Sequence, residues 1–210
     1  MLHHEHPARP TLLRRIVNRL RGPGDATGKN AERLELLARM PRGAVCAEIG
    51  VWKGAYSRHI LRLADPATLY LVDPWAFRGE FPGRLYGGGA AQGQKDMDAI
   101  HRDVRRAFAG DQRVSVRRET ADAFFRALPD AALDWVYIDG DHGLEGVTAD
   151  LEGAFRTVKP GGAIAGDDYE WTDEAGVASV KQATDAFCSR HGLALELLGD
   201  QFLIRRAACR

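Results

Sequence analysis

Two short apolar runs and the segment between them occupy residues 133–168, LDWVYIDGDHGLEGVTADLEGAFRTVKPGGAIAGDD. The runs 133–139 and 162–168 have the length and composition of buried strands, and each ends in an aspartate. The segment 143–157 between them is long enough for a helix. A strand, a helix and a second strand in this order predict two parallel strands joined by a right-handed crossover.

The same alternation of strand-like and helix-like segments extends on both sides of this stretch. Upstream, strands are predicted at 44–50, 68–73 and 113–119, and helices at 54–64, 94–109 and 120–128. Downstream, a helix is predicted at 176–190, followed by strands at 193–198 and 201–206 that Gly199 and Asp200 join as a hairpin. The pattern predicts the α/β class: a Rossmann-like, seven-stranded, mostly parallel sheet with helices on both faces and a C-terminal antiparallel hairpin.

Length and composition fit one globular domain with an appendage. The chain has 210 residues, of which 45% are hydrophobic and 28% charged, so it can form a core without disulfides or a structural metal. We expect residues 1–40 to form an N-terminal tail and helical appendage, and residues 41–210 to form the domain. In the appendage, residues 11–21 predict a basic amphipathic helix that either packs on protein or touches an anionic surface. A second short helix is predicted at 30–40.

Charge, hydropathy and cysteine content limit the partners and the location. The 29 basic and 29 acidic residues cancel, which gives no general attraction to nucleic acid. No apolar run approaches the roughly 18 residues of a membrane span, so no stable membrane insertion is expected. The three cysteines lack metal-ligand spacing and favour a reduced, cytoplasmic location. A homodimer is a common arrangement for small enzymes, but the sequence leaves the oligomeric state open.

Four aspartates follow the two strands of the opening stretch. Asp139 and Asp141 follow the fourth predicted strand, and Asp167 and Asp168 follow the fifth. Ligands of open α/β sheets bind beyond the carboxyl ends of the strands, so we expect these carboxylates to converge there. A hard divalent cation such as Mg²⁺ would offset their repulsion and polarise a bound hydroxyl. The alternative is that some of these acids cap the helices that follow them.

The turn after the first predicted strand holds a second group of candidate binding residues. Its sequence is Glu48-Ile49-Gly50-Val51-Trp52-Lys53-Gly54. Gly50 and Gly54 allow a tight turn and a close approach of a ligand to the backbone. Trp52 stands where the dinucleotide fingerprint G-x-G-x-x-G needs its second glycine, which argues against a pyrophosphate site. A generic strand–helix turn is the alternative interpretation.

Further positions at strand ends suit a nucleoside. Asp73, at the end of the second predicted strand, suits two ribose hydroxyls. Trp75 follows closely and is expected either to contact adenine or to pack on the core. After the third strand, Ala121 and Asp122 are placed to reach adenine, although Asp122 would serve equally as a cap or first-turn acid of the next helix.

A family resemblance rests on three segments: AEIGVWKGAYSRHIL at 47–61, LYLVDPW at 69–75 and VYIDGDHGLEGVTADLEGAFRTVKPGGAIAGDDY at 136–169. Together they resemble the class I S-adenosylmethionine (SAM)-dependent methyltransferases. Within that class they look like small-molecule O-methyltransferases, including the macrocin-type enzymes that methylate hydroxyls on sugars of natural products. The resemblance covers residues 41–206. This chain is shorter than the macrocin-type enzymes, and residues 76–93 are its main candidate lid.

The resemblance implies a role for each matching residue in cofactor binding. Glu48, Gly50 and Gly54 would cradle the methionine part of SAM, and Asp73 would bind its ribose. The other residues expected to contact the cofactor are Val51, Trp52, Trp75, Ala121, Asp122 and Asp139.

The resemblance also implies roles in metal binding and catalysis. Asp139, Asp167 and Asp168 match the acidic metal ligands of the macrocin-like group. Asp141 matches the general base of such enzymes. His142 departs from the family pattern and adds a second base candidate, because imidazole has a pKa near neutrality.

We therefore expect the chain to transfer a methyl group from SAM to a hydroxyl of a small molecule, assisted by a divalent metal. The catalytic candidates are Asp139, Asp141 and His142. One alternative is a metal-independent SAM methyltransferase that acts on nitrogen or oxygen. A nucleotide-binding oxidoreductase is a further alternative, against which the missing G-x-G-x-x-G argues. The last alternative is a SAM-binding subunit without catalytic activity. The intact acidic cluster argues against it, because such a subunit would not need these acids.

Overall fold

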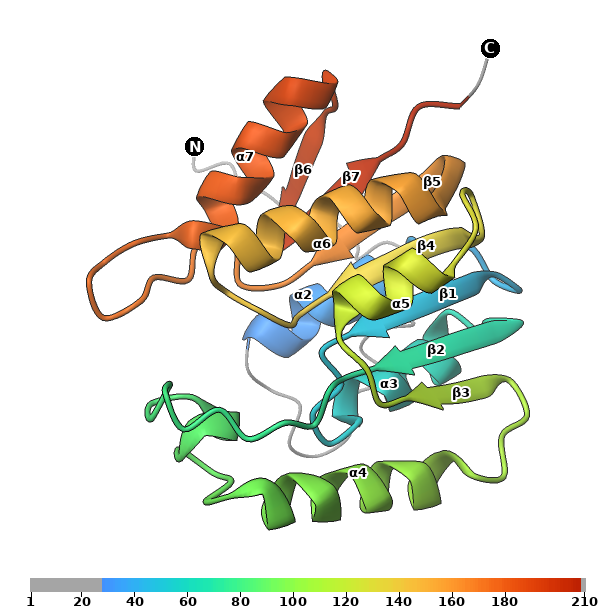
Figure 1. The fold of residues 1–210 in the computed structure, drawn as a ribbon. Coiled ribbons are helices and arrows are strands. Elements are labelled where there is room, and N and C mark those ends of the chain that lie inside the picture. The colour runs from blue at the N-terminus through green and yellow to red at the C-terminus, as the bar shows by residue number, and fades with distance from the viewer. Residues whose placement is uncertain (1–27, 209–210) are drawn as a thin grey trace, which may run out of the picture.

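The computed structural model describes residues 28–208 and contains one mixed sheet with helices on both sides (Figure 1). The strands are β1 (Val45–Ile49), β2 (Thr68–Val72), β3 (Val114–Arg117), β4 (Leu133–Ile138), β5 (Val158–Gly166), β6 (Leu195–Leu198) and β7 (Gln201–Arg205). The helices are α2 (Gly28–Leu37), α3 (Ala55–Leu63), α4 (Gln94–Phe108), α5 (Ala121–Ala127), α6 (Leu144–Thr157) and α7 (Ser179–His191), with a short 3-10 turn, η1 (Leu85–Gly87), before α4. The predicted helix at 11–21 and the tail before it lie outside the described residues.

The sheet has the strand order β3-β2-β1-β4-β5-β7-β6. Strands β1 to β5 run parallel, and β7 pairs antiparallel with both β5 and β6. Gly199 and Asp200 connect β6 to β7, and Gly199 has the positive φ, 59°, that a two-residue hairpin turn favours. The predicted fold class is therefore confirmed, including its C-terminal antiparallel hairpin.

Among the predicted boundaries that differ from the structure, two have clear local reasons. β5 begins at Val158 rather than at residue 162, because Val158 already pairs with Leu133 ahead of a bulge. α7 begins at Ser179 rather than at residue 176, because the side chain of Asp173 accepts two backbone N–H groups and closes a turn there. Neither difference moves the carboxyl end of a strand, where the candidate site lies.

Alternate residues of each strand supply two hydrophobic cores on opposite faces of the sheet. In β4, Trp135 and Tyr137 belong to the core that α2, α3 and α4 cover, while Val136 and Ile138 belong to the core that α5, α6 and α7 cover. Figure 1 shows α5, α6 and α7 in front of the sheet and α2 and α3 behind it. Because both faces are covered, the central strands β1 and β4 are mostly apolar, with Glu48 and Asp134 as their charged residues.

α2 packs into the domain core. Its Leu36 and Leu37 are fully buried in the same core as α3, and the helix contacts both α3 and β7. Glu32, also on α2, accepts a hydrogen bond from the backbone N–H of Asp200 in the β6–β7 turn. This packing brings Arg33 to the carboxyl ends of β4 and β5.

β1 and β4 leave the sheet at a tight junction around Gly50. The Gly50 N–H donates to the Val72 carbonyl oxygen at 2.9 Å, and the Asp139 N–H donates to the Ile49 carbonyl oxygen at 2.8 Å. Gly50 has a φ of 87°, and a Cβ built on it would lie 1.9 Å from the carbonyl oxygen of Asp139. Glycine is required here because both the backbone conformation and the available space exclude a side chain.

We predict that Gly50→Ala lowers the free energy of unfolding by about 2–4 kcal/mol, because a strained φ and overpacking act together. Gly192→Ala is the matched control. Gly192 has a φ of 63°, but no atom lies within 4 Å of a Cβ added to it. Gly192→Ala should therefore lower the free energy of unfolding by only about 1 kcal/mol. Urea unfolding measures both costs, and equal values would contradict the steric contact at Gly50.

Candidate functional site

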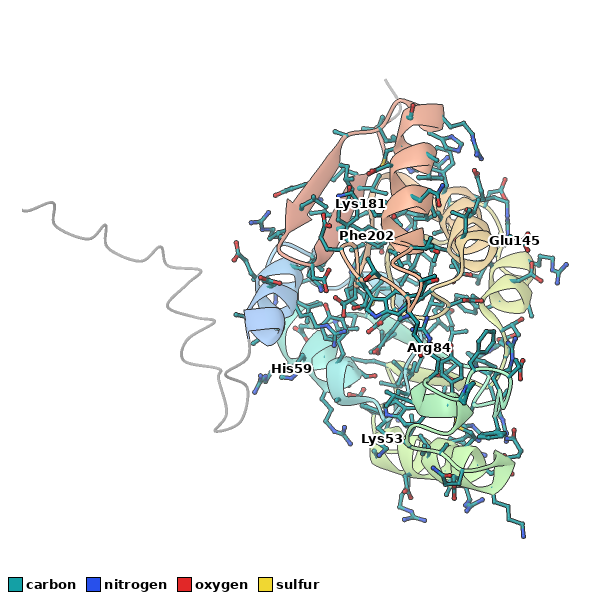
Figure 2. All side chains as sticks on the ribbon, turned by 90° about the vertical axis from the view of Figure 1, so that its left-hand side faces the viewer. Lys53, His59, Arg84, Glu145, Lys181 and Phe202 are labelled. Carbon is teal, nitrogen blue, oxygen red and sulfur yellow. The ribbon has the colours of Figure 1, made fainter. Side chains whose placement is uncertain are left out.

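A cavity of about 860 Å³ opens at the carboxyl ends of the parallel strands, the edge of the sheet that Figure 2 presents to the viewer. It lies among the β1–α3 turn, the β2–α4 loop, the start of α5 and the turns after β4 and β5. The predicted site residues that line it are Glu48, Gly50, Val51, Trp52, Asp73, Ala121, Asp122, Asp139, Asp141, His142 and Asp168. The other predicted residues, Gly54, Trp75 and Asp167, do not line it.

Asp73 ties the β1–α3 turn to the end of β2. Its Oδ2 accepts the backbone N–H groups of Val51 and Trp52 at 3.0 and 2.9 Å, and its Oδ1 accepts that of Trp75 at 2.6 Å. Burial raises the pKa of Asp73, and these three hydrogen bonds partly oppose that rise. A carboxylate has about four acceptor sites, so one remains for a ligand hydroxyl.

Two predicted binding residues serve packing instead. Gly54 begins α3 with a φ of 70°, and a Cβ on it would lie 2.8 Å from Cε2 of Phe108. Trp75 is fully buried, lies with its ring centroid 4.8 Å from that of His101, and donates Nε1–H to the Trp52 carbonyl oxygen at 2.9 Å. The structure thus favours the alternative interpretation of Trp75, a core tryptophan, over the adenine contact. Its role is to hold the backbone of Trp52, which does line the cavity.

Glu48 is a buried carboxyl in the cavity lining. It is 2% exposed and accepts a hydrogen bond of 2.5 Å from Ser57 Oγ of α3. Burial raises the pKa of Glu48 to about 8, although the Ser57 hydrogen bond lowers it. An incoming ammonium group would stabilise its ionised form.

The start of α5 lines another wall of the cavity. Thr120 Oγ1 accepts the backbone N–H of Ala123 at 3.2 Å and caps the helix. Asp122 is therefore not the cap; it is exposed and pairs with Arg126 one turn later. Ala121 and Asp122 both line the cavity, but the carboxylate of Asp122 already has a cationic partner.

Arg33 from α2 lies between the acids that follow β4 and β5. Its Nη2 is 2.8 Å from Asp139 Oδ2 and also contacts Asp167 Oδ2. The side chain of Asp167 is fully buried, and that of Arg33 is 21% exposed. A guanidinium stays charged at all physiological pH values, so it offsets the repulsion between these carboxylates.

Asp167 is held from a second side by the C-terminal hairpin. Gln201 Nε2 donates to Asp167 Oδ1, and Gln201 Oε1 accepts the hydroxyl of Tyr137 at 2.6 Å. Gln201 is fully buried. Both carboxylate oxygens of Asp167 therefore have protein partners behind the cavity wall.

The acids and His142 form two groups of potential metal ligands. In the first, one donor atom each from Asp139, His142 and Asp168 lies within 4.8 Å of the others. In the second, the same holds for Asp167, Asp168 and Asp200. The three predicted ligands Asp139, Asp167 and Asp168 are thus divided between these groups, because Asp167 faces Gln201 and Arg33.

His142 is engaged at both ring nitrogens. Nε2 lies 3.1 Å from Asp168 Oδ2, and Arg84 Nη1 donates to Nδ1 at 2.9 Å. Burial lowers the pKa of His142, but the hydrogen bonds and charges of Asp139 and Asp168 outweigh burial and raise it to about 9. Arg84 can donate only to the neutral ring, so protonation of His142 would break its contact with Arg84.

The β2–α4 loop, which contains the candidate lid at residues 76–93, contributes several residues to the cavity lining. Arg84, labelled near the middle of Figure 2, belongs to this loop and stacks its guanidinium 4.1 Å from the ring centroid of Trp171. Phe81 and Tyr86 of the same loop also line the cavity. The stacking joins the lid to the segment that follows β5.

Asp141 is the exposed member of the acidic group. Its Oδ1 accepts the backbone N–H of Gly143 at 2.7 Å, at the start of α6. A Cβ on Gly146 would lie 2.5 Å from Asp141 Oδ2, so a glycine at this position makes room for the carboxylate. Within residues 28–208, Oδ2 accepts no hydrogen bond, and Asp141 lines the cavity.

Several residues of the cavity were not predicted from the sequence, and three of them bear on its chemistry: Arg33, Trp171 and Asp150. Arg33 and Trp171 lie outside the segments that carry the family resemblance, so no motif marks them. Asp150 lies inside such a segment, on α6, and only its burial against the cavity distinguishes it from the other acids of that helix.

Comparisons with known proteins identify the family and the fold. A family model described as a methyltransferase domain matches residues 47–169. No curated protein matches the sequence significantly. Among solved structures, the O-methyltransferase NovP aligns with 84% of this chain and 80% of its own, at 20% identity and a TM-score of 0.56. A putative caffeoyl-CoA O-methyltransferase from Staphylococcus aureus aligns with 90% of this chain and 88% of its own, at 14% identity and a TM-score of 0.58.

A SAM-dependent methyltransferase from Aquifex aeolicus aligns with 91% of this chain and 96% of its own, at 14% identity and a TM-score of 0.55. At such identities these neighbours establish the shared fold alone. The family model covers more than half of the 210 residues, from β1 to the turn after β5, and includes Gly50, Asp73 and the acids after β4 and β5. The chain therefore belongs to the methyltransferase domain family.

Proposed function

We propose that this chain transfers a methyl group from SAM to a hydroxyl oxygen of a small molecule. The observation that carries the proposal is a shared cavity, because one lining brings together residues from four strand ends. They are Gly50 after β1, Asp73 after β2, Asp139 and Asp141 after β4, and Asp168 after β5. Family membership and the O-methyltransferases among the structural neighbours support the same reaction. Family membership also weighs against an oxidoreductase.

The chemistry of the cavity residues fits the three parts of SAM. When bound, SAM supplies a methyl group that its sulfonium charge already activates. Glu48, a buried carboxyl with a pKa of about 8, suits the ammonium group of the methionine part. Asp73 keeps an acceptor site for the ribose, and Ala121 lines the wall proposed for adenine.

Asp141 is the better candidate for the general base. Its Oδ2 accepts no hydrogen bond within residues 28–208, and the residue faces the cavity. Although burial lowers the pKa of His142, Asp139 and Asp168 raise it to about 9, so near neutral pH its ring is mostly protonated and cannot accept a substrate proton. Asp141 is thus positioned to remove the hydroxyl proton while the cavity aligns the acceptor with the methyl group.

We propose that a divalent cation, Mg²⁺ for preference, binds at Asp139 and Asp168 with His142 beside them. Their donor atoms lie within 4.8 Å of one another, and the two carboxylates supply the oxygen ligands that hard cations prefer. When bound, the cation would favour the deprotonated form of an acceptor hydroxyl. Asp167 would then support the site through Arg33 and Gln201 rather than as a ligand.

A metal-independent reaction is the second candidate, and Arg33 is the observation that favours it. Its guanidinium already contacts both Asp139 and Asp167, so part of the carboxylate repulsion is offset without a metal. In that case Asp139 and Asp168 would shape the pocket only, and the acceptor would be an oxygen or nitrogen atom.

We propose a small molecule as the acceptor, no nucleic acid as a partner, a cytoplasmic location and a homodimer as the oligomer to test first. Phe81, Arg84 and Tyr86 of the lid give the acceptor end of the cavity an aromatic and basic character. Among residues 28–208, no helix has the length and apolar character needed to cross a membrane.

Calorimetric titration with S-adenosylhomocysteine (SAH), the demethylated product, tests cofactor binding. We expect saturable binding at one site, and methyl transfer to members of a panel of phenols and sugars. EDTA should abolish transfer and Mg²⁺ should restore it, whereas Asp168→Asn should lose the response to Mg²⁺. Asp168 has a φ of 61°, which asparagine tolerates, so this variant keeps the turn. Absence of SAH binding would refute the proposal, and transfer that survives EDTA would favour the metal-independent reaction.

Asp141→Asn should lower kcat by about 100- to 10,000-fold, because it removes the proton acceptor. SAH affinity should change little, since the carboxylate lies at the acceptor side of the acids. His142→Gln should lower kcat by only about tenfold, through loss of its contacts with Asp168 and Arg84. Steady-state kinetics of both variants decide the assignment, and the reverse order of effects would make His142 the base.

Arg33→Met should lower the free energy of unfolding by about 2 kcal/mol, because it leaves Asp139 and buried Asp167 without their cation. In a chain that already carries Asp167→Asn, Arg33→Met should lower the free energy of unfolding by about 1 kcal/mol less than it does in the wild type. Arg39→Met on the same helix is the control, since Arg39 forms exposed pairs with Glu35 and Glu196 and should cost below about 1 kcal/mol. Additive costs in the double variant would show that Arg33 and Asp167 are not coupled.

A further inference from the structure

Asp150 is a buried carboxyl in the cavity lining with no assigned role. It lies in the middle of α6, is 6% exposed, and belongs to the cavity lining together with Gly140 and Ala149. A Cβ built on Gly140 would lie 3.8 Å from Asp150 Oδ2, so the carboxyl group reaches back to the residue that follows Asp139. The side chain therefore points along the end of β4 toward the binding site.

The carboxyl group of Asp150 has no hydrogen-bond donor within residues 28–208. Burial, together with the charges of Asp141 and Asp122, raises the pKa of Asp150 to about 7. Buried polar groups almost always form hydrogen bonds, because burial without a hydrogen-bond partner destabilises the folded state. A buried acceptor at the wall of a ligand cavity is therefore explained if the ligand brings the donor.

The surroundings of Asp150 indicate what kind of donor fits. The charges of Asp141 and Asp122 act on Asp150, and a Cβ built on Gly140 would lie 3.8 Å from its Oδ2. The other cavity residues at the start of α5 and on α6 are Thr120, Ala121, Gly146 and Ala149. All these residues are small or acidic, and the cavity's cationic residues, Arg33, Lys53, Arg78 and Arg84, come from other elements. The small side chains leave room for a flat ring. The carboxylate of Asp150 is a hydrogen-bond acceptor, so a complementary ring would carry an N–H or O–H donor at its edge.

We propose that Asp150 accepts a hydrogen bond from the exocyclic amine of the adenine ring and so selects adenosine over nucleosides that lack this amine. The inference rests on the proposed function, since it places SAM in the cavity. Asp150 suits this task better than Asp122, because Asp122 is exposed and already paired with Arg126. The buried acceptor also discriminates more strongly, because a ligand without the amine leaves the carboxylate unsatisfied.

The test compares SAH with S-inosylhomocysteine, in which an oxo group replaces the exocyclic amine. Calorimetry at pH 8 keeps Asp150 mainly ionised, because its pKa is about 7. The wild-type chain should bind SAH about 10- to 100-fold more tightly than the inosyl analogue. Asp150→Ala should reduce this ratio to within about threefold of unity. Asp150→Asn, which offers both a donor and an acceptor, should bind both ligands with similar affinity.

A control variant and melting curves show whether a change in the binding ratio is specific to Asp150. Glu152→Gln lies on the same helix, pairs with Arg190 outside the cavity, and should leave the ratio unchanged. The melting temperature of Asp150→Ala should be at least as high as that of the wild type, because alanine removes a mostly buried carboxyl group that has no donor within residues 28–208.

Each outcome decides one claim. An unchanged ratio in Asp150→Ala overturns the inference while the proposed function stands. If Asp122→Asn no longer prefers SAH over the inosyl analogue while Asp150→Ala still does, the amine contact belongs to Asp122. That outcome also overturns the inference. Failure of the wild-type chain to bind SAH overturns the proposed function, and the inference with it.

Discussion

The candidate site depends on one electrostatic constraint: the acids that follow β4 and β5 must lie close together in a partly buried place. Arg33 meets this constraint, since its guanidinium contacts Asp139 after β4 and Asp167 after β5. Arg33 is held in position by α2, whose Leu36 and Leu37 are buried in the domain core. The helix that precedes β1 is therefore part of the site, and the hydrophobic packing of α2 indirectly sets the geometry of the acids.

Periodicity made most of the fold predictable. Nearly every side chain of residues 133–138 is apolar, which is typical of a strand that helices cover on both faces. These residues indeed form a buried strand. Because parallel strands end at the same edge of a sheet, acids that follow neighbouring strands were expected to meet, and Asp139 and Asp168 do. Gly199-Asp200 predicted the hairpin through the φ that its turn requires.

The parts that could not be predicted depend on contacts between distant segments. Arg33 is separated from Asp139 by 106 positions and lies outside the alternating pattern. Trp75 follows Asp73, the proposed ribose ligand, yet it has a positive φ of 42° and its side chain is buried in the core. α6 contains Glu145, Asp150 and Glu152, and only tertiary packing shows that Asp150 alone of these is buried.

The position of Gln201 has a consequence for how the chain acquires its site during synthesis. Asp167 receives one partner, Arg33, from the first described helix and the other, Gln201, from the last strand. A nascent chain whose β7 is still inside the ribosome already contains every acid of the site but lacks the amide that holds Asp167. The acids after β4 and β5 therefore reach their final arrangement only when the C-terminal hairpin closes against β5.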